Sequence, residues 1–452
     1  MKKNIAIFIL TYFLIPQDTL VIIDDQIITK TDFIKRAEYT VRPKYCNTDN
    51  NIDKKIILNS LIAEKLLALE NNSELDIEAL RLLKGIKEQT MRRVMLEDQV
   101  NHHLIIDTNI ILDLYNRSLF DYQIDFLNIV PSEVKTVIED LKSKVSFNDI
   151  AKKIKKNTAQ KTITFFNSSN KKIHQKIYNN DFNKDHILEP LEISDNSYIL
   201  IKIRNKKKNV IINPEYQQSY YKEIEKYYLQ SKSCEIRKNY IEDIMSGKKI
   251  EFNEASFFSL ANYYYNEEKD TSINTQDILF TLDNKEWKIE DLIEINHLNP
   301  LLFRGSYSNQ NEFYSEFKLA LVDLIQNYYL TKKAYNLNYL NHPIVSKETK
   351  IWYNYILANY EKEKIIDKNQ PLPESYNSEY KIIENILDKK LENLFIQYSD
   401  RISIDVDVFN GIKLSNIDML VINTNQPYQL AVPPFPRLTT KSNLDYGVKK
   451  DL

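Results

Sequence analysis

Hydrophobic and polar positions near the start of the chain predict a strand pair followed by a helix. Two short apolar runs, Leu20–Ile23 and Ile27–Ile28, flank an acidic pair, a pattern typical of strand, turn and strand. Thr29 lies three residues before Asp32, which is the spacing of a helix N-cap and its partner. We therefore expect a helix to begin directly after the second strand.

A longer helix is expected over residues 53–70. Its apolar residues recur at helical spacing and mark one face, in which Lys65 is the single polar member. That face consists of Ile57, Leu61, Ile62, Lys65, Leu66 and Leu69.

The same pattern of positions returns near residue 280, which suggests an internal duplication. Leu282-Asp283-Asn284 leads to Trp287 and then to Asp291–Ile293, in the order found after Ile23. A later helix over 319–333 repeats the apolar positions of the helix over 53–70. The alternative is that two amphipathic helices resemble each other by chance.

A second repeat concerns a long helix that runs into a short strand. A helix over 216–245 precedes an alternating segment at 249–252, and a helix over 380–398 precedes one at 401–404. We therefore expect two modules, each built from an early and a late piece. The first would comprise residues 18–119, completed by a helical return segment at 213–277, and the second residues 278–424.

The segment 120–212 is predicted to be a small α+β unit inserted in the first module. Tyr122–Val130 alternates like a strand, helices follow through residue 154, and Ser197–Ile203 alternates again. The tail at 425–452 contains closely spaced prolines, which cannot enter a helix or a central strand, so we expect it to be extended and loosely held.

The first residues have the pattern of an export signal. Lys2-Lys3 precedes an apolar run from Ile5 to Ile15, too short to span the hydrocarbon core of a membrane as a helix. Residues 1–17 are therefore predicted to be a secretory signal or, since no small-residue cleavage site follows, a retained membrane anchor. A buried first strand is the alternative.

Composition excludes several classes of function. Among 452 residues, 61 Lys and Arg stand against 63 Asp and Glu, so the chain offers no overall positive field for nucleic acid. Its five glycines stand apart, so neither a dinucleotide-binding fingerprint nor a P-loop is present. Two cysteines and the adjacent pair His102-His103 do not form a zinc pattern. We expect no metal, no cofactor and no nucleic-acid partner.

The order of the predicted pieces resembles a known family. Leu20–Asn71 resembles the N-terminal domain of SurA-type periplasmic chaperones and foldases, and Asp107–Tyr115 is similar to the short helix that leads those proteins into their parvulin domain. Tyr122–Val130, the helices over 134–154 and the segment 189–202 resemble the first strand, first helices and last strand of a parvulin peptidyl-prolyl isomerase. The resemblance implies a mostly helical α+β fold with two SurA-like modules and an inserted parvulin-like domain.

The sequence departs from parvulins at the positions that line their pocket. Parvulins usually place histidines in the first and last strands, where this chain has Phe126 and Tyr198, and their glycine-rich loop is missing between Gly85 and Gly247. Isomerisation requires a pocket that removes water from the imide and fixes the proline ring. We expect weak or absent isomerase activity, with an active isomerase that uses Phe126 and Tyr198 as the alternative.

The resemblance implies an exported chaperone for unfolded or outer-membrane-bound polypeptides, in the periplasm or another extracytoplasmic compartment. A holding chaperone needs an accessible apolar surface rather than a catalytic group. Core packing is the alternative role for every candidate, because helical spacing does not say what buries a face. The candidates for client binding are Leu61, Leu66, Leu69, Leu324, Tyr328, Tyr329 and Leu330.

Two other classes of function remain open at this point. An assembly factor with a single partner would share the same fold. Hydrolase chemistry has little support, because pairs such as Asp24-Asp25 are sufficiently explained as turn residues.

Overall fold

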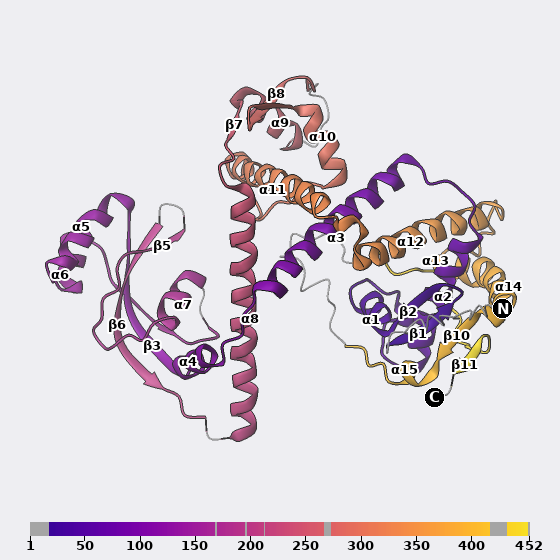
Figure 1. Cartoon of the computed structure of the whole chain (residues 1–452), viewed down its shortest axis with the longest axis horizontal. Helices are drawn as coiled ribbons and strands as arrows, with labels where there is room; N and C mark the ends of the chain where they lie inside the picture. Colours follow the sequence, from indigo (N-terminus) through magenta and orange to yellow (C-terminus); the bar gives the residue numbers. More distant parts are fainter. Residues whose placement is uncertain are drawn as a thin grey trace, which may run out of the picture. The chain divides into compact units, whose positions relative to one another are not determined.

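The fold is α+β and mostly helical, as the sequence predicts (Figure 1). Contacts divide the chain into unit 1, made of Met1–Glu97 and Glu242–Leu452, and unit 2, made of Asp98–Ile241. The expected signal at residues 1–17 lies outside the residues described. The computed structural model describes residues 18–167, 170–194, 197–211, 213–265, 273–415 and 432–450.

The first sheet of unit 1 joins strands from both ends of the chain. β1 (Thr19–Ile23) and β2 (Gln26–Thr29) form the predicted hairpin. β10 (Ile402–Asp405) pairs antiparallel with the other side of β1, and β11 (Val448–Lys450) pairs parallel with β10. The order β11-β10-β1-β2 leaves β2 as an edge strand among the described residues.

Helix α1 (Lys30–Glu38) begins at the predicted cap. The Thr29 Oγ1 atom accepts a hydrogen bond from the Asp32 backbone at 3.1 Å, and Asp32 Oδ2 accepts one from the Thr29 backbone at 3.1 Å. This reciprocal pair satisfies two backbone donors that the helix itself cannot pair. The cap therefore fixes how the chain leaves β2.

Helix α2 (Asn51–Glu70) is the centre of the first core of unit 1. Ile57, Ile62 and Leu66 are fully buried, and so are polar residues on its other sides, because neighbouring elements surround the helix. The other helical elements of this body are η1 (Lys44–Cys46), α12 (Pro343–Asp367), α13 (Glu379–Ile382), η3 (Ile383–Leu387), α14 (Asp388–Gln397), η4 (Ser399–Arg401) and α15 (Val406–Asn410).

A second, smaller sheet of unit 1 has its own aromatic core. Its strand order is β7-β8-β9, and Phe280 stacks on Trp287 with ring centroids 5.5 Å apart. Phe313 and Phe317 are also fully buried there. The elements are β7 (Ile250–Phe252), α9 (Glu254–Tyr265), β8 (Ile278–Leu282), β9 (Lys285–Lys288), α10 (Ile289–Leu298), α11 (Gln310–Asn336) and η2 (Tyr339–Asn341).

Helix α3 (Ile77–His103) contacts this second body at Gly85 and Arg92. A Cβ atom at Gly85 would collide with the backbone carbonyl of Leu298, so only glycine permits this approach of α10. Nearby, Arg92 donates hydrogen bonds to Thr331 and Asn299 at 2.7 Å each.

The two sheets of unit 1 repeat one motif, as the duplicated sequence pattern predicts. Each has a hairpin with a left-handed aspartate in its turn, Asp24 at φ 52° and Asp283 at φ 51°. Each hairpin leads into a helix whose third residue caps it, since Asp291 Oδ2 accepts a hydrogen bond from the Lys288 backbone at 2.9 Å as Asp32 does for Thr29.

The partners of the two late strands differ from the prediction. The strand in the return segment at 213–277 is β7, which pairs with β8 of the second hairpin, with Phe252 opposite Phe280. The first hairpin is completed by β10 instead, with Val21 opposite Ile404. The assignment of 213–277 to the first module is therefore wrong in its strand pairing, because periodicity identifies a strand but not the strand beside it.

The tail is extended where it is described, at 432–450, but it is firmly packed. Tyr446 is buried and stacks on Phe395, with centroids 4.3 Å apart and planes 4° apart. Its hydroxyl donates a hydrogen bond to Asn59 Oδ1 at 2.5 Å. Phe435 and Leu438 belong to the same core as α2. The expectation of a loosely held tail is wrong for this part, because its apolar residues complete that core.

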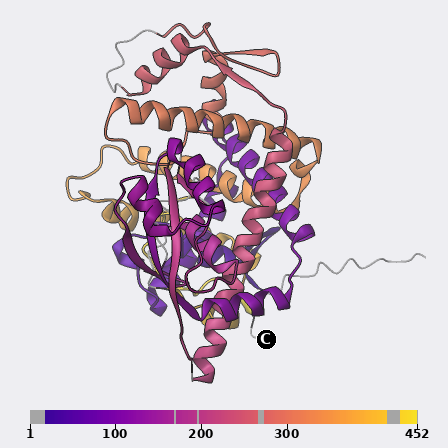
Figure 2. The same ribbon diagram turned by 90° about the vertical axis from the view of Figure 1, so that its left-hand side faces the viewer.

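Unit 2 contains an antiparallel sheet of order β4-β3-β6-β5 with helices on both faces. The two long strands β3 (Phe120–Ile129) and β6 (Ser197–Lys208) run side by side in its centre (Figures 1 and 2). These are the predicted first and last strands of the inserted unit. The other elements are α4 (Thr108–Ser118), α5 (Pro131–Lys142), α6 (Phe147–Lys153), β4 (Ala159–Ile163), α7 (Lys171–Tyr178), β5 (Leu191–Ser194) and α8 (Pro214–Met245).

Candidate functional site

The two predicted parvulin-pocket positions do not lie together. Phe126 of β3 packs with the apolar cluster on one face of the sheet, whereas Tyr198 of β6 packs with Leu127 and Ile129 on the other face. Successive residues of a strand point to opposite faces, and Tyr198 lies opposite Ile129 rather than opposite Phe126. The pocket expected around Phe126 and Tyr198 is therefore not formed.

His174 is the buried histidine of unit 2, and core packing accounts for it. Its Nε2 atom lies 2.7 Å from the Phe165 carbonyl oxygen, and its Nδ1 atom lies 3.1 Å from the Tyr227 hydroxyl. Burial lowers the pKa of this imidazole below its ordinary value. Both ring nitrogens are thus engaged by the core.

Most of the predicted client-binding residues are also packed inside unit 1. Leu66, Leu324 and Leu330 are buried, and Leu69 packs half-buried against the first core. Tyr328 packs edge-on against Trp287 with centroids 5.0 Å apart. The Tyr329 hydroxyl donates a hydrogen bond to Asp283 at 2.9 Å, and Lys248 Nζ lies 4.1 Å from the centroid of its ring.

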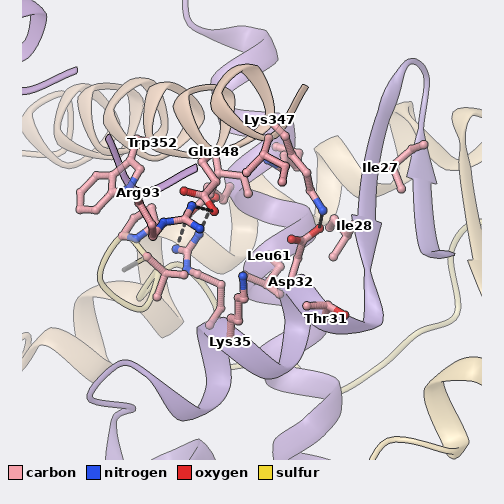
Figure 3. A pocket seen from close by; sticks show the side chains of 17 residues that line it. Ile27, Ile28, Thr31, Asp32, Lys35, Leu61, Arg93, Lys347, Glu348 and Trp352 are labelled. Atoms are coloured by element: carbon pink, nitrogen blue, oxygen red, sulfur yellow. Dashed lines mark hydrogen bonds and ion pairs between the residues drawn. The ribbon is translucent and has the colours of Figure 1, made fainter. Parts of the chain in front are cut away.

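Leu61, the remaining candidate, lines a cavity of about 230 Å³ between β2, α1, α2 and α12, which we call the α2–α12 pocket (Figure 3). Ile27 and Ile28 of β2 contribute apolar walls, and so do Ile351 and Trp352 of α12. The volume is below the roughly 300–1,000 Å³ of typical small-molecule sites. It suits one or two apolar side chains.

Charged residues surround the apolar walls, and most of them form ion pairs. Lys347 Nζ lies 3.0 Å from Asp32 Oδ2, so the carboxylate that caps α1 also ties α12 to it. Arg93 Nη2 donates a hydrogen bond to Glu348 Oε1 at 2.7 Å. These pairs appear as dashed lines in Figure 3.

A third pair among the lining residues, between Arg36 and Glu64, is buried. Arg36 donates two parallel hydrogen bonds to the Glu64 carboxylate, at 3.1 and 2.7 Å, and a third to the Pro434 carbonyl oxygen at 2.9 Å. Both side chains are nearly inaccessible, with 3% and 1% of their surface exposed. Such bidentate geometry is what compensates two buried charges for lost water.

Two cations of the pocket have no such partner. Lys65 is only 7% exposed, and neither it nor the exposed Lys35 (labelled in Figure 3) forms a side-chain hydrogen bond or ion pair with the residues described. Burial lowers the pKa of the Lys65 ammonium below its ordinary value, and Glu64 opposes that shift. The three carboxylates of the pocket, Asp32, Glu64 and Glu348, are all paired already.

Sequence reasoning found part of this site. Leu61 was among the candidates, and Lys65 was the polar exception on an apolar helix face. The sequence did not indicate that α12 forms a wall of this pocket. Ile351 and Trp352 are distant in sequence from β2, α1 and α2, and no nearby residue shows which elements they contact. Ile344, also on α12, was missed for the same reason.

Other chemistry finds no support in the part of the chain that the structure describes. Groups of three or more His, Cys, Asp and Glu side chains placed to share a metal ion do not occur in it. None of its helices combines the length and apolar character needed to cross a membrane.

Comparison with known proteins gives limited similarity. No protein-family model matches this sequence, and no curated protein matches it either. Among solved structures, the chain is similar to the peptidylprolyl isomerase PrsA from Bacillus anthracis, at 14% identity and a TM-score of 0.18, covering 41% of this chain and 96% of that one. It is also similar to the foldase protein PrsA from Streptococcus pneumoniae, at 12% identity and a TM-score of 0.19, covering 48% and 91%. TM-scores this low carry no argument about this chain's fold or activity.

Proposed function

We propose that this chain is an exported chaperone of the SurA type that holds unfolded polypeptides in the α2–α12 pocket without catalysing their isomerisation. The observation that carries the proposal is an apolar pocket with a charged rim beside an edge strand. Ile27 and Ile344 line it and remain 39% and 42% exposed. Apolar side chains of a client can bury this surface, while the rim keeps the complex hydrated.

The edge strand adds a second mode of contact. Among the residues described, β2 ends its sheet, and an extended polypeptide can add main-chain hydrogen bonds to such an edge. Because Ile27 and Ile28 belong both to β2 and to the pocket, one client segment can use both features. Main-chain recognition of this kind suits clients of many sequences.

Suppression of aggregation tests the proposal. The full chain, mixed in equal amounts with an unfolded outer-membrane protein, is expected to reduce light scattering. The double variant Ile27→Gln/Ile344→Gln is expected to bind the client about tenfold more weakly, because it removes exposed apolar surface without creating a cavity. A matched control is Ile396→Gln on α14, which is 73% exposed and outside the pocket.

The outcomes separate the classes of function. If the double variant and the control suppress aggregation equally, the client binds at another surface and not in the α2–α12 pocket. No suppression by the native chain would reject a general chaperone and leave an assembly factor, for which affinity capture returns a single partner.

The separation of Phe126 and Tyr198 on opposite faces supports an inactive parvulin-like unit. In a protease-coupled proline-peptide assay, we expect the native chain not to exceed the uncatalysed rate. Tyr198→Ala is expected to change nothing. Turnover that falls in this variant would instead favour the active isomerase.

A further inference from the structure

The unpaired cations of the α2–α12 pocket indicate what kind of polypeptide end it binds. Lys65 lines the pocket together with the apolar residues Leu61, Ile351 and Trp352. Burial of most of this side chain removes part of the water around the ammonium, and no hydrogen bond to a described residue replaces that water. Among the residues described, every carboxylate of the pocket already has its own cation, so the missing partner is an anion from outside.

The surroundings of Lys65 restrict that anion to a small carboxylate attached to an apolar group. The pocket volume of about 230 Å³ suits one or two side chains. Its walls are Leu61, Ile351 and Trp352, which favour an aliphatic or aromatic group. Lys35 adds a second, exposed cation at the same pocket, so the net charge of the lining favours an anion.

The edge strand then decides between a free acid and the end of a chain. β2 is an edge strand among the described residues, and Ile27, its one exposed residue, also lines the pocket, so a polypeptide can contact the main chain there while a fatty acid cannot pair with it. An apolar C-terminal residue carries a side chain and a carboxylate on one carbon. The apolar walls of the pocket can bind the side chain, and its lysines can bind the carboxylate.

We propose that the α2–α12 pocket captures the free C-terminus of an unfolded polypeptide that ends in an apolar residue. The terminal carboxylate contacts Lys65 and Lys35, the last side chain fills the space between Leu61 and Trp352, and the preceding residues extend along β2. This inference rests on the proposed function and specifies its client. Recognition of the chain end also explains why the pocket is small.

Paired peptides test the proposal. Two decapeptides of one sequence ending in Phe, one with a free carboxylate and one with a C-terminal amide, are titrated into the full chain. Binding is followed by fluorescence of Trp352 in a Trp287→Phe background, because the chain has two tryptophans and Trp287 lies in the other core. The acid is expected to bind about tenfold more tightly than the amide, as a charge-assisted contact provides.

Variants connect the discrimination to Lys65. Lys65→Met keeps the length of the side chain and is expected to bind acid and amide equally. Lys55→Met, on the same helix but outside the pocket, is expected to retain the tenfold preference. Circular dichroism checks that each variant is folded, and Lys35→Met, a change at an exposed residue, gives an independent reduction of the preference.

The remaining outcomes overturn the inference in distinguishable ways. Equal binding of acid and amide by the native chain rejects C-terminal capture but leaves the chaperone proposal intact. Failure to bind either peptide, together with failure to suppress aggregation, rejects both. A preference that persists in Lys65→Met assigns the carboxylate to another group. Displacement of the acid peptide by laurate at equal affinity would identify a fatty acid as the occupant.

Discussion

Replacing Glu64 by Gln is expected to lower the free energy of unfolding of unit 1 by about 3–5 kcal/mol, the range found when one partner of a buried ion pair is removed. Glu64 accepts both hydrogen bonds of the Arg36 fork, and its charge also opposes the burial-induced fall in the pKa of Lys65. The variant leaves two neighbouring cations buried with no carboxylate between them. Urea unfolding followed by Trp352 fluorescence in the Trp287→Phe background measures the loss.

Two comparisons sharpen this prediction. Glu97→Gln removes one carboxylate from the more exposed pair with Arg93 and should cost less than about 1 kcal/mol. The double variant Glu64→Gln/Lys65→Met is expected to recover part of the loss, because it leaves one buried cation rather than two. A Glu64→Gln variant as stable as Glu97→Gln would show that water reaches this pair.

The loss is also expected to depend on pH with a definite sign. The pKa of Lys65 is lowered in the folded protein and is further lowered when Glu64 is neutral, whereas the unfolded lysine keeps its ordinary value of 10.5. Between these values the unfolded chain binds more protons, so stability rises with pH. The defect of Glu64→Gln should therefore shrink as the pH approaches 10.5. The charges around Lys65 are those of Glu64, Arg36, Asp32 and Lys350.

Replacing Tyr446 by Ala is expected to destabilise unit 1 by about 3–5 kcal/mol, the usual range for removing a buried aromatic ring. The ring stacks on Phe395, and its hydroxyl donates a hydrogen bond to Asn59 Oδ1, so the change leaves a cavity and removes the tyrosine donor from that buried oxygen. Chemical denaturation of the purified full chain measures the effect.

The matched variant Tyr446→Phe keeps the ring and removes only the hydroxyl. It is expected to cost about 1–2 kcal/mol, in line with one buried hydrogen bond. If Tyr446→Ala were as mild as this control, the tail would be an accessory segment rather than part of the core. A loss of about 3–5 kcal/mol in both variants would instead place the stabilisation in the hydrogen bond to Asn59.

Local features of the fold followed from sequence because their causes are local. The cap formed by Thr29 and Asp32, the hairpin turns and the long α2 face all depend on residues within a few positions of each other. Strand partners depend on surfaces that meet only after folding, which is why β7 and β10 were assigned to the wrong hairpins.

The same distinction applies to the site. Phe126 and Tyr198 were matched to a family pattern by position, and the alternation of faces along β3 and β6 then separated them. Lys65 was visible as a polar exception within an apolar face, but its meaning required the walls that α12 supplies. A charged residue on an apolar helix face can thus indicate a binding site, but the structure is needed to show which residues surround it.

The strand order of the first sheet of unit 1 also determines when this sheet can form during translation. Its β1 strand, which ends at Ile23, is made well before its neighbour β10, which begins at Ile402, and before the outermost β11. At about 5–20 residues per second, the nascent β1–β2 hairpin waits on the order of tens of seconds for its partner. Unit 2 is one continuous stretch, so it can fold on the ribosome first. During its own synthesis, a chain proposed to bind unfolded polypeptides therefore exposes the side of β1 that later pairs with β10.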